Sequence, residues 1–362
     1  MKIRPFHVLF KALILFVVIN LVYAVIDPSP AAFTLVNHLL PGFERFPINR
    51  TLFIKPDGTT GFNNNTITDL DILFSTHVLS SEPKETGEYR VILLGDSSTW
   101  GFGVSPDQTL SGVINHAELR TCNNEQIRAY SLAWPSNSAL KDLLIMASSD
   151  AYEPDMFIWL YSLQAFVPDR QSTLAESNLL DYLDLVQHYQ LDSSFQPEDS
   201  LSKPDFWDRT IWGQRLDLGT QIQVQGFALS RYFFGCDDIS PKVLEAEGIV
   251  IKPPGVDDLF SGRSETNDLF RNQWLRPFDT LRVAYQIAAE RPLLLVNEPT
   301  LIETGQNSDI RYNWIYPRWA FDQYRDFMRD LTSRNHWIYY DFWDLLPKSE
   351  FYDSVFHRTA LG

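Results

Sequence analysis

The fold of this chain is decided at residues 91–101, whose sequence is VILLGDSSTWG. The apolar, branched first half of this stretch has the length and composition of a buried strand, and the small polar residues that follow are typical of a helix start. The pattern therefore places Ser97 at the carboxyl end of a strand and beside a helix N-terminus. Unpaired backbone N–H groups there favour negative charge, and a serine that attacks a carbonyl creates such a charge. The alternative is that Ser97 or Ser98 only caps the following helix.

From Tyr89 onward, apolar runs of strand length alternate with helical stretches. We expect strands at residues 90–94, 126–132, 156–161, 292–297 and 337–341, and helices near 108–120, 139–149, 278–291 and 317–335. Continuously apolar strands separated by helices are typical of a parallel sheet covered on both faces. The sequence therefore predicts an α/β protein, a three-layer α/β/α sandwich of the doubly wound, flavodoxin-like type with a mainly parallel five-stranded sheet. Sites in such sheets lie beyond the carboxyl ends of the strands, which is where Ser97 falls.

Three parts of the chain differ in composition and hydrophobic pattern. We expect an N-terminal membrane anchor at residues 1–27, a stalk or irregular lead-in at 28–88, which is rich in Pro, Asn, Thr and Gly, and the α/β domain at 89–362. The stretch between the third strand and the helix near 278 is too long for a structureless loop in a compact domain. We therefore expect an inserted, mainly helical cap at about 165–275, with a helix at 177–189 and with Trp207, Trp212 and Trp274 packed inside it.

The N-terminus carries an apolar stretch from Val8 to Ile26 that only Lys11 and Asn20 interrupt. Its length suits one membrane-spanning helix. Basic residues precede the stretch and Asp27 follows it, so the positive-inside rule places the N-terminus in the cytoplasm and the remainder outside. A cleaved signal peptide is the alternative, with a small-residue cleavage site at residues 22–24, and a buried core helix is a third.

The composition limits which partners and cofactors we expect. The 362 residues are 44% hydrophobic, which is enough for a full-sized core, and carry a formal charge of −16. An acidic surface repels polyphosphates, so nucleic acid is not an expected partner. The only cysteines are Cys122 and Cys236, which are too few for a structural zinc site and are either one disulfide or two separate thiols. No cluster of His, Asp and Glu has ligand spacing, so neither a metal nor another cofactor is expected.

The pattern Gly-Asp-Ser-x-Thr-x-Gly at residues 95–101 resembles the first sequence block of the SGNH/GDSL hydrolase superfamily. The resemblance extends in scattered blocks from Tyr89 to Gly362, and the layout is similar to that of membrane-anchored bacterial members. It implies that Ser97 is the nucleophile. The family's last block reads Asp-x-x-His, whereas this chain has one residue more between Asp353 and His357. The resemblance implies His357 as the general base and Asp353 as its orienting partner, with Asp341 and Asp344 as the alternatives for that partner.

The two middle blocks of the family are altered in this chain. Ser136 stands where the family has a glycine whose backbone N–H joins the oxyanion hole, and a backbone donor survives that change. Gln164, after the third strand, stands near the place of an asparagine and could donate through its side-chain amide. The resemblance therefore implies an oxyanion hole made by the backbone N–H groups of Ser97 and Ser136 with help from Gln164.

The candidate substrate contacts lie beside the serine and in an aromatic, basic segment at residues 311–319. They are Asp96, Trp100, Arg311, Tyr316 and Arg318. Pro317 can begin a helix in that segment, on the same edge of the sheet as Ser97. Aromatic and guanidinium groups can hold a sugar or an acyl donor, and the alternative is a loop that only packs over the core.

Together these residues predict a membrane-anchored, extracytoplasmic serine ester hydrolase that acts through a Ser-His-Asp acyl-enzyme on acyl or acetyl esters of carbohydrate or lipid. Two alternatives stay open. A sugar hydroxyl in place of water would make the protein an O-acyltransferase that modifies a surface polysaccharide. Because the middle and last blocks are altered, the chain could also be an inactive binding module that keeps the fold. A phosphate-binding loop is not expected, because residues 95–103 lack the Gly-Lys-Ser/Thr ending.

Overall fold

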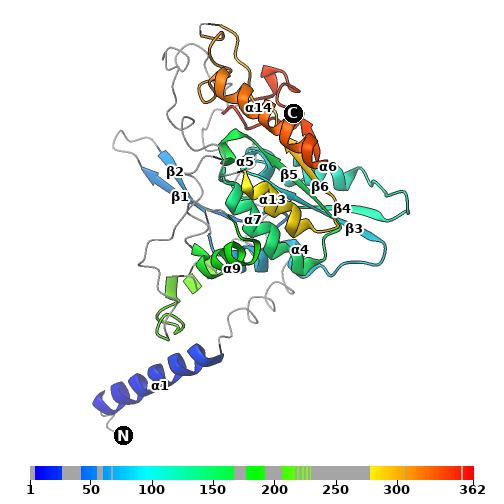
Figure 1. The fold of residues 1–362 in the computed structure, drawn as a ribbon. Helices are drawn as coiled ribbons and strands as arrows, with labels where there is room; N and C mark the ends of the chain where they lie inside the picture. Colours follow the sequence, from blue (N-terminus) through cyan, green and yellow to red (C-terminus); the bar gives the residue numbers. More distant parts are fainter. Residues whose placement is uncertain are drawn as a thin grey trace.

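A computed structural model describes most of the chain (Figure 1). The described residues are 5–26, 42–54, 60–66, 68–166, 177–191, 206–216, 218–219, 222–223, 226, 229, 278–305, 307–351 and 354–362. Asp353, Cys236, Trp274 and most of the expected cap lie outside them.

A five-stranded parallel sheet forms the centre of the fold, in the order β4-β3-β5-β6-β7. The strands are β3 (Glu88–Leu94), β4 (Gln126–Ser131), β5 (Met156–Tyr161), β6 (Leu293–Asn297) and β7 (Ile338–Asp341). The chain leaves β3 toward one edge of the sheet and then returns to build the other edge. Neighbouring connections diverge at such a point and leave a crevice at the carboxyl ends of the strands. This arrangement confirms the predicted doubly wound α/β fold.

Helices cover the two faces of the sheet as right-handed crossovers require. They are α6 (Leu110–His116), α7 (Ala139–Ser148), α13 (Asp279–Ala288) and α14 (Arg318–Asn335). Along β3, Ile92 and Leu94 join the main core with α7, α13 and α14. The intervening residues Val91 and Leu93 face the other side, where Ile114 of α6 packs against them. The alternation of a buried strand therefore supplies both apolar layers.

The lead-in before the sheet is more regular than the sequence suggests. It contains the antiparallel strands β1 (Ile48–Ile54) and β2 (Thr60–Thr66), followed by the short helices α3 (Leu70–Thr76) and α4 (Val78–Ser81). Asp69 caps α3, because its Oδ1 accepts the backbone N–H of Ile72 at 2.9 Å. Leu73 and Phe74 of this helix are buried in the same core cluster as the sheet. This part of the lead-in is therefore packed on the α/β domain.

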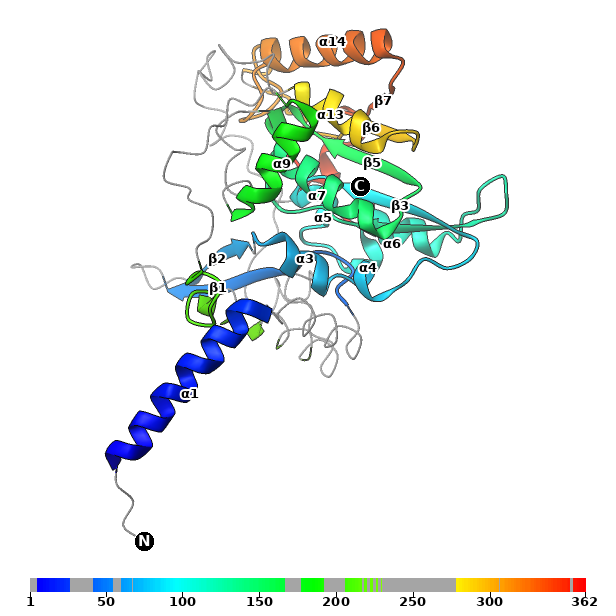
Figure 2. The same ribbon diagram turned by 60° about the horizontal axis from the view of Figure 1, so that its bottom comes forward.

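Two further helices lie outside the sheet layers. Helix α9 (Leu179–Tyr189) falls within the helix expected at 177–189 and packs against α7 through Tyr182 and Leu185. Helix α1 (Pro5–Ile26) extends away from the domain (Figures 1 and 2). It is long and apolar enough to cross a membrane, a test that an N-terminal signal sequence also passes.

Candidate active site

The loop after β3 presents Ser97 at the carboxyl edge of the sheet. Ser97 is half-buried and is the first residue of α5 (Ser97–Trp100). The cap of α5 is Asp96, whose Oδ1 accepts the backbone N–H of Ser98 at 2.8 Å. A Cβ on Gly95 would lie 2.4 Å from the Thr99 hydroxyl oxygen and 3.0 Å from the Leu160 carbonyl oxygen, so only glycine fits there. Because Asp96 does the capping, the Ser97 hydroxyl is not needed for it.

His357 meets Ser97 from the other end of the chain. Its Nε2 lies 2.9 Å from the Ser97 Oγ, which is hydrogen-bond distance for a nucleophile and its base. The imidazole stacks on Phe102, with 4.7 Å between ring centroids. Its loop is held by Ser354, whose Oγ accepts the backbone N–H groups of Phe356 and His357 at 3.2 and 2.9 Å. The structure therefore brings together the serine and the histidine that the sequence singles out.

The third member of the predicted triad is the carboxylate that would orient His357. Asp353 lies outside the described residues, so its role stays a prediction. Asp341, one of the alternatives, accepts a hydrogen bond from Asn297 at 2.8 Å and pairs with Arg325 at 2.9 Å. Asp344 is exposed. The contacts of Asp341 therefore tie it to α14 and β6.

The two altered blocks meet each other beside the sheet. Gln164 is buried in a short helix (Leu163–Phe166), and its Oε1 accepts the Asn137 amide at 3.3 Å. The backbone N–H of Ser136 donates to the Trp134 carbonyl at 2.6 Å. That turn would have to relax before this N–H could reach an oxyanion, so the donor roles of Ser136 and Gln164 stay predictions.

A buried ion pair that sequence reasoning missed lies beneath the serine loop. Lys141 is only 1% exposed, and its Nζ donates to the carbonyl oxygens of Gly95 and Trp134 at 2.6 and 3.0 Å. It also pairs with Asp142 at 2.7 Å, whose other oxygen accepts the Trp159 indole N–H at 2.9 Å. Burial raises the pKa of Asp142 to about 6, although Lys141 opposes the shift. The pair links the first and second sequence blocks.

A second missed carboxylate joins the serine loop to the histidine loop. Glu298 follows β6, is 1% exposed, and accepts hydrogen bonds on one oxygen from the Ser98 hydroxyl and from Arg358, the latter at 2.8 Å. Burial raises the pKa of Glu298 to about 7; Asp96 adds to the shift and Arg358 opposes it. Its position directly after an expected strand, at the carboxyl edge of a parallel sheet, was the signal that could have found it.

The predicted substrate contacts are engaged inside the protein. The Trp100 indole donates to the Phe46 carbonyl at 2.7 Å and lies under the Arg45 guanidinium. Arg311 donates to the Asn313 and Trp314 carbonyls, Arg318 donates to the Ser308 carbonyl and lies over Tyr312, and Tyr316 is fully buried. These are the contacts of a packed loop, and a role in substrate binding stays a prediction for these residues and for Asp96.

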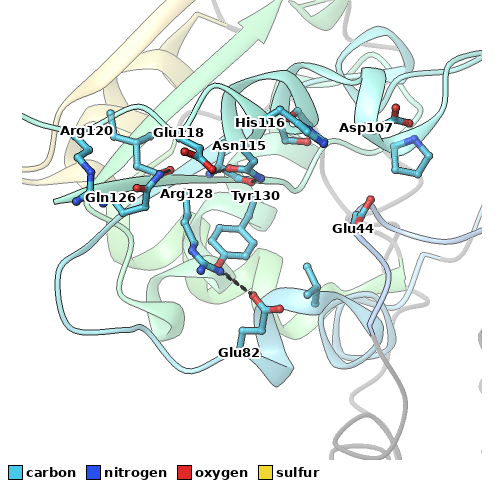
Figure 3. Close-up of a pocket in the computed structure, with 16 residues that line it drawn as sticks. Glu44, Glu82, Asp107, Asn115, His116, Glu118, Arg120, Gln126, Arg128 and Tyr130 are labelled. Carbon is cyan, nitrogen blue, oxygen red and sulfur yellow. Dashed lines mark hydrogen bonds and ion pairs between the residues drawn. The ribbon is translucent and has the colours of Figure 1, made fainter.

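A polar groove of about 590 Å³ lies along the outer edge of β4 (Figure 3). Glu82, His116 and Arg128 line it, and neither the serine loop nor the histidine loop contributes. The backbone of the edge strand is already satisfied there, because the Asn115 amide both donates to and accepts from Ala129, at 2.9 and 2.8 Å. That pairing protects the edge from the addition of another strand. Among the described residues, no three His, Cys, Asp or Glu side chains lie together as a metal site would require. Cys122 is an exposed free thiol.

Comparisons with known proteins add little to this geometry. No family model and no curated protein matches the sequence. Among solved structures, a carbohydrate acetylesterase family member from Sinorhizobium meliloti is 11% identical with a TM-score of 0.32, over 75% of this chain and 90% of that one. The native aryl esterase of M. smegmatis is also 11% identical, with a TM-score of 0.30 over 75% of this chain and 91% of its own. Similarity this low supports no argument about activity.

Proposed function

We propose that this protein is a membrane-anchored, extracytoplasmic serine ester hydrolase of the SGNH/GDSL type. The observation that carries the proposal is the 2.9 Å contact between the Ser97 Oγ and the His357 Nε2 at the carboxyl edge of the sheet. Both side chains are only half-buried, so a substrate can reach them. The pairing joins two residues that a family resemblance had selected independently of their distance.

In the proposed reaction, His357 accepts the proton of Ser97 as the serine oxygen attacks an ester carbonyl. The tetrahedral intermediate collapses to an acyl-enzyme when His357 returns the proton to the leaving alcohol, and water then repeats the sequence in reverse. We assign the oxyanion hole to the backbone N–H groups of Ser97 and Ser136 and to the Gln164 amide, and the orientation of the imidazole to Asp353. Binding of the carbonyl oxygen would have to open the 134–136 turn.

Glu298 is the proposed positioning residue of this site. It binds the residue that follows each of the two, Ser98 after Ser97 and Arg358 after His357. A single buried carboxylate therefore determines the spacing of the two loops. Its negative charge would also stabilise the imidazolium that forms on His357 during the attack.

The proposed location follows from α1. Its apolar side chains are exposed almost all round, which water does not favour and lipid does. Basic residues precede it in the sequence, so we place the N-terminus in the cytoplasm and the hydrolase domain outside. Esters of carbohydrate or lipid at the cell surface are then the substrates within reach.

The proposal is tested with the full-length protein in detergent or nanodiscs and with aryl acetates of short chain length. We expect turnover and covalent labelling by a fluorophosphonate probe, both lost in Ser97→Ala and both kept in Ser105→Ala, which removes a serine hydroxyl from a loop outside the site. Labelling that survives in Ser97→Ala, or no labelling of the native protein, would reject the proposed nucleophile. A sugar acceptor added to the assay separates the reactions, because acetyl that appears on the sugar at the expense of free acetate indicates a transferase.

A further inference from the structure

A segment of the insertion rests against the end of α1 that is nearest the domain. The backbone N–H of Trp212 donates to the Asn20 Oδ1 at 3.1 Å, and the Tyr23 hydroxyl donates to the Gln214 side chain, also at 3.1 Å. Asn20, Tyr23 and Ala24 lie on one face of the helix, because they are three and four residues apart. Asn20 and Ala24 are 7% and 3% exposed, so this face is covered. Figures 1 and 2 show the segment beside the C-terminal end of α1.

This segment, residues 206–216, turns its tryptophans outward. Trp207 is 67% exposed and Trp212 is 64% exposed, where the sequence led us to expect packing inside a cap. Arg215 lies over the Trp212 ring, with 5.0 Å between the guanidinium carbon and the ring centroid. Outward indoles accompanied by arginine are typical of the membrane–water interface, where the ring lies at headgroup level and the long basic side chain reaches water.

The depth of the contact agrees with that location. Helix α1 is apolar over Phe6–Ile26, and about 17 residues are enough to cross the hydrocarbon of a bilayer. A span that begins at Phe6 would then end near Val22, which holds Asn20 about 3 Å below the outer boundary at 1.5 Å per residue. A side-chain amide at that depth needs partners. Asn20 has two, the Phe16 carbonyl at 2.9 Å and the Trp212 N–H, so its second partner requires residues 206–216 to enter the lipid interface.

We propose that residues 206–216 form a second membrane contact, with Trp207 and Trp212 in the headgroup layer of the outer leaflet of the bilayer that α1 crosses. The proposal rests on the proposed anchoring by α1. The segment is hydrogen-bonded to α1 at Asn20 and Tyr23, so the occupant we commit to is the same lipid surface. Two membrane contacts would fix the orientation of the domain, and the esterase site would stand at a set height above the lipid.

The test places a fluorescent probe at single cysteines of the full-length protein in phosphatidylcholine vesicles. Trp207→Cys and Trp212→Cys are made in a background with Cys122→Ser and Cys236→Ser, and are labelled with a nitrobenzoxadiazole fluorophore. Lipids that carry a doxyl quencher near the headgroup should quench both probes at least twofold. The native Cys122, which is exposed, is the control in a Cys236→Ser protein and should not be quenched.

A further cysteine, Val17→Cys in α1, separates the two proposals. If mid-chain doxyl quenches the probe at residue 17 while neither tryptophan position responds, α1 spans the bilayer and the second contact is wrong. If the tryptophan positions respond and residue 17 does not, the second contact stands and the anchor is wrong. A Trp207→Ser/Trp212→Ser protein should keep its turnover of a soluble aryl acetate. If that variant instead converts a dimer to a monomer, or if soluble polysaccharide shifts the probes and vesicles do not, the occupant is not lipid and the proposal fails.

Discussion

The two loops that meet at the candidate active site are held in different ways. The serine loop grows out of the central strand β3 and is fixed by the core, with Lys141 on the Gly95 carbonyl and with Asp96 as helix cap. The histidine loop comes from the end of the chain and follows the edge strand β7. Val355 and Phe356 of this loop are buried in the main core, and the contacts nearest the imidazole are the turn at Ser354, the stacking on Phe102 and the ion pair of Arg358 with Glu298.

Mutations in the two loops should therefore have different effects, one on the stability of the fold and the other on the position of the catalytic base. Charges buried under the serine loop are part of the main core, so damage to them should unfold the domain. The contacts that align His357 itself, with Phe102 and through Arg358 with Glu298, are few, so the loss of one of them should leave the fold intact and misplace the base. Small errors of position are costly in catalysis, because the reacting atoms must lie within a few tenths of an ångström of the productive geometry.

The largest effect on activity is expected where the two loops touch. Ser97→Ala or His357→Ala should lower kcat on the order of 10⁴–10⁶-fold, because each removes a group that forms or breaks a bond. Both side chains are half-buried, so the melting temperature should change little. The double variant should be no slower than either single one, since the residues act as a unit. Additive losses in the double variant would show that the two side chains do not cooperate.

The largest effect on stability is expected under the serine loop. Lys141→Met leaves the buried Asp142 without its cation and should cost about 3–5 kcal/mol of unfolding free energy, measured by denaturant titration. Arg334→Met is the control, since its ion pair with Asp330 is exposed and should be worth well under about 1 kcal/mol.

The stability of Lys141→Met should also depend on pH. The folded-state pKa of Asp142 is raised, so the native protein binds the proton more tightly than the unfolded chain does, and stability falls as pH rises from the ordinary value of 3.8 to about 6. Loss of Lys141 raises this pKa further. The loss of unfolding free energy in Lys141→Met should therefore be smallest near pH 4 and grow toward pH 7. If the loss of unfolding free energy in this variant does not depend on pH, Lys141 acts by packing alone.

Glu298→Gln tests the link between the loops. The variant keeps the shape of the side chain but loses the charge that holds Arg358, and we expect kcat to fall about 10- to 100-fold with KM unchanged. Burial raises the pKa of Glu298 to about 7, and only the ionised carboxylate holds Arg358, so kcat/KM of the native protein should fall as Glu298 takes up its proton below that pH. The charged and titratable groups that face Glu298 are Asp96, Arg358 and Tyr316.

In Glu298→Gln this part of the pH dependence should be absent, which the loss of a purely structural ion pair would not cause. The native stability should also decline between about pH 4.5 and pH 7, because a raised carboxyl pKa favours the protonated folded state, and the variant should lack this decline. Glu303→Gln is the matched control, a buried glutamate paired with Lys348. A pH profile of kcat/KM that is unchanged in Glu298→Gln would reject the positioning role.

The sequence predicted what depends on periodicity and short motifs. The strand expected at 156–161 is β5, and the helix expected at 317–335 is α14, because long apolar or amphipathic runs have few other ways to bury themselves. The pairing of Ser97 with His357 was implied by the family resemblance, and their places after strands agreed with it. Lys141 and Glu298 were missed, since a charged residue that will be buried looks in sequence like any surface charge. Only the assembled sheet shows which polar groups it encloses.

The smallest effect is expected at Phe102, whose ring stacks on His357 without a hydrogen bond. Removing the ring in Phe102→Leu should widen the range of imidazole orientations and lower kcat about 2- to 10-fold, in line with the strength of aromatic pairs. Phe102→Tyr keeps the ring and should restore the native rate. Because the ring carries no charge, the pH profile should not move in either variant. A loss as large as that of Glu298→Gln would mean that the histidine loop is aligned by packing at the rim, and that the buried carboxylate is not what joins the two loops.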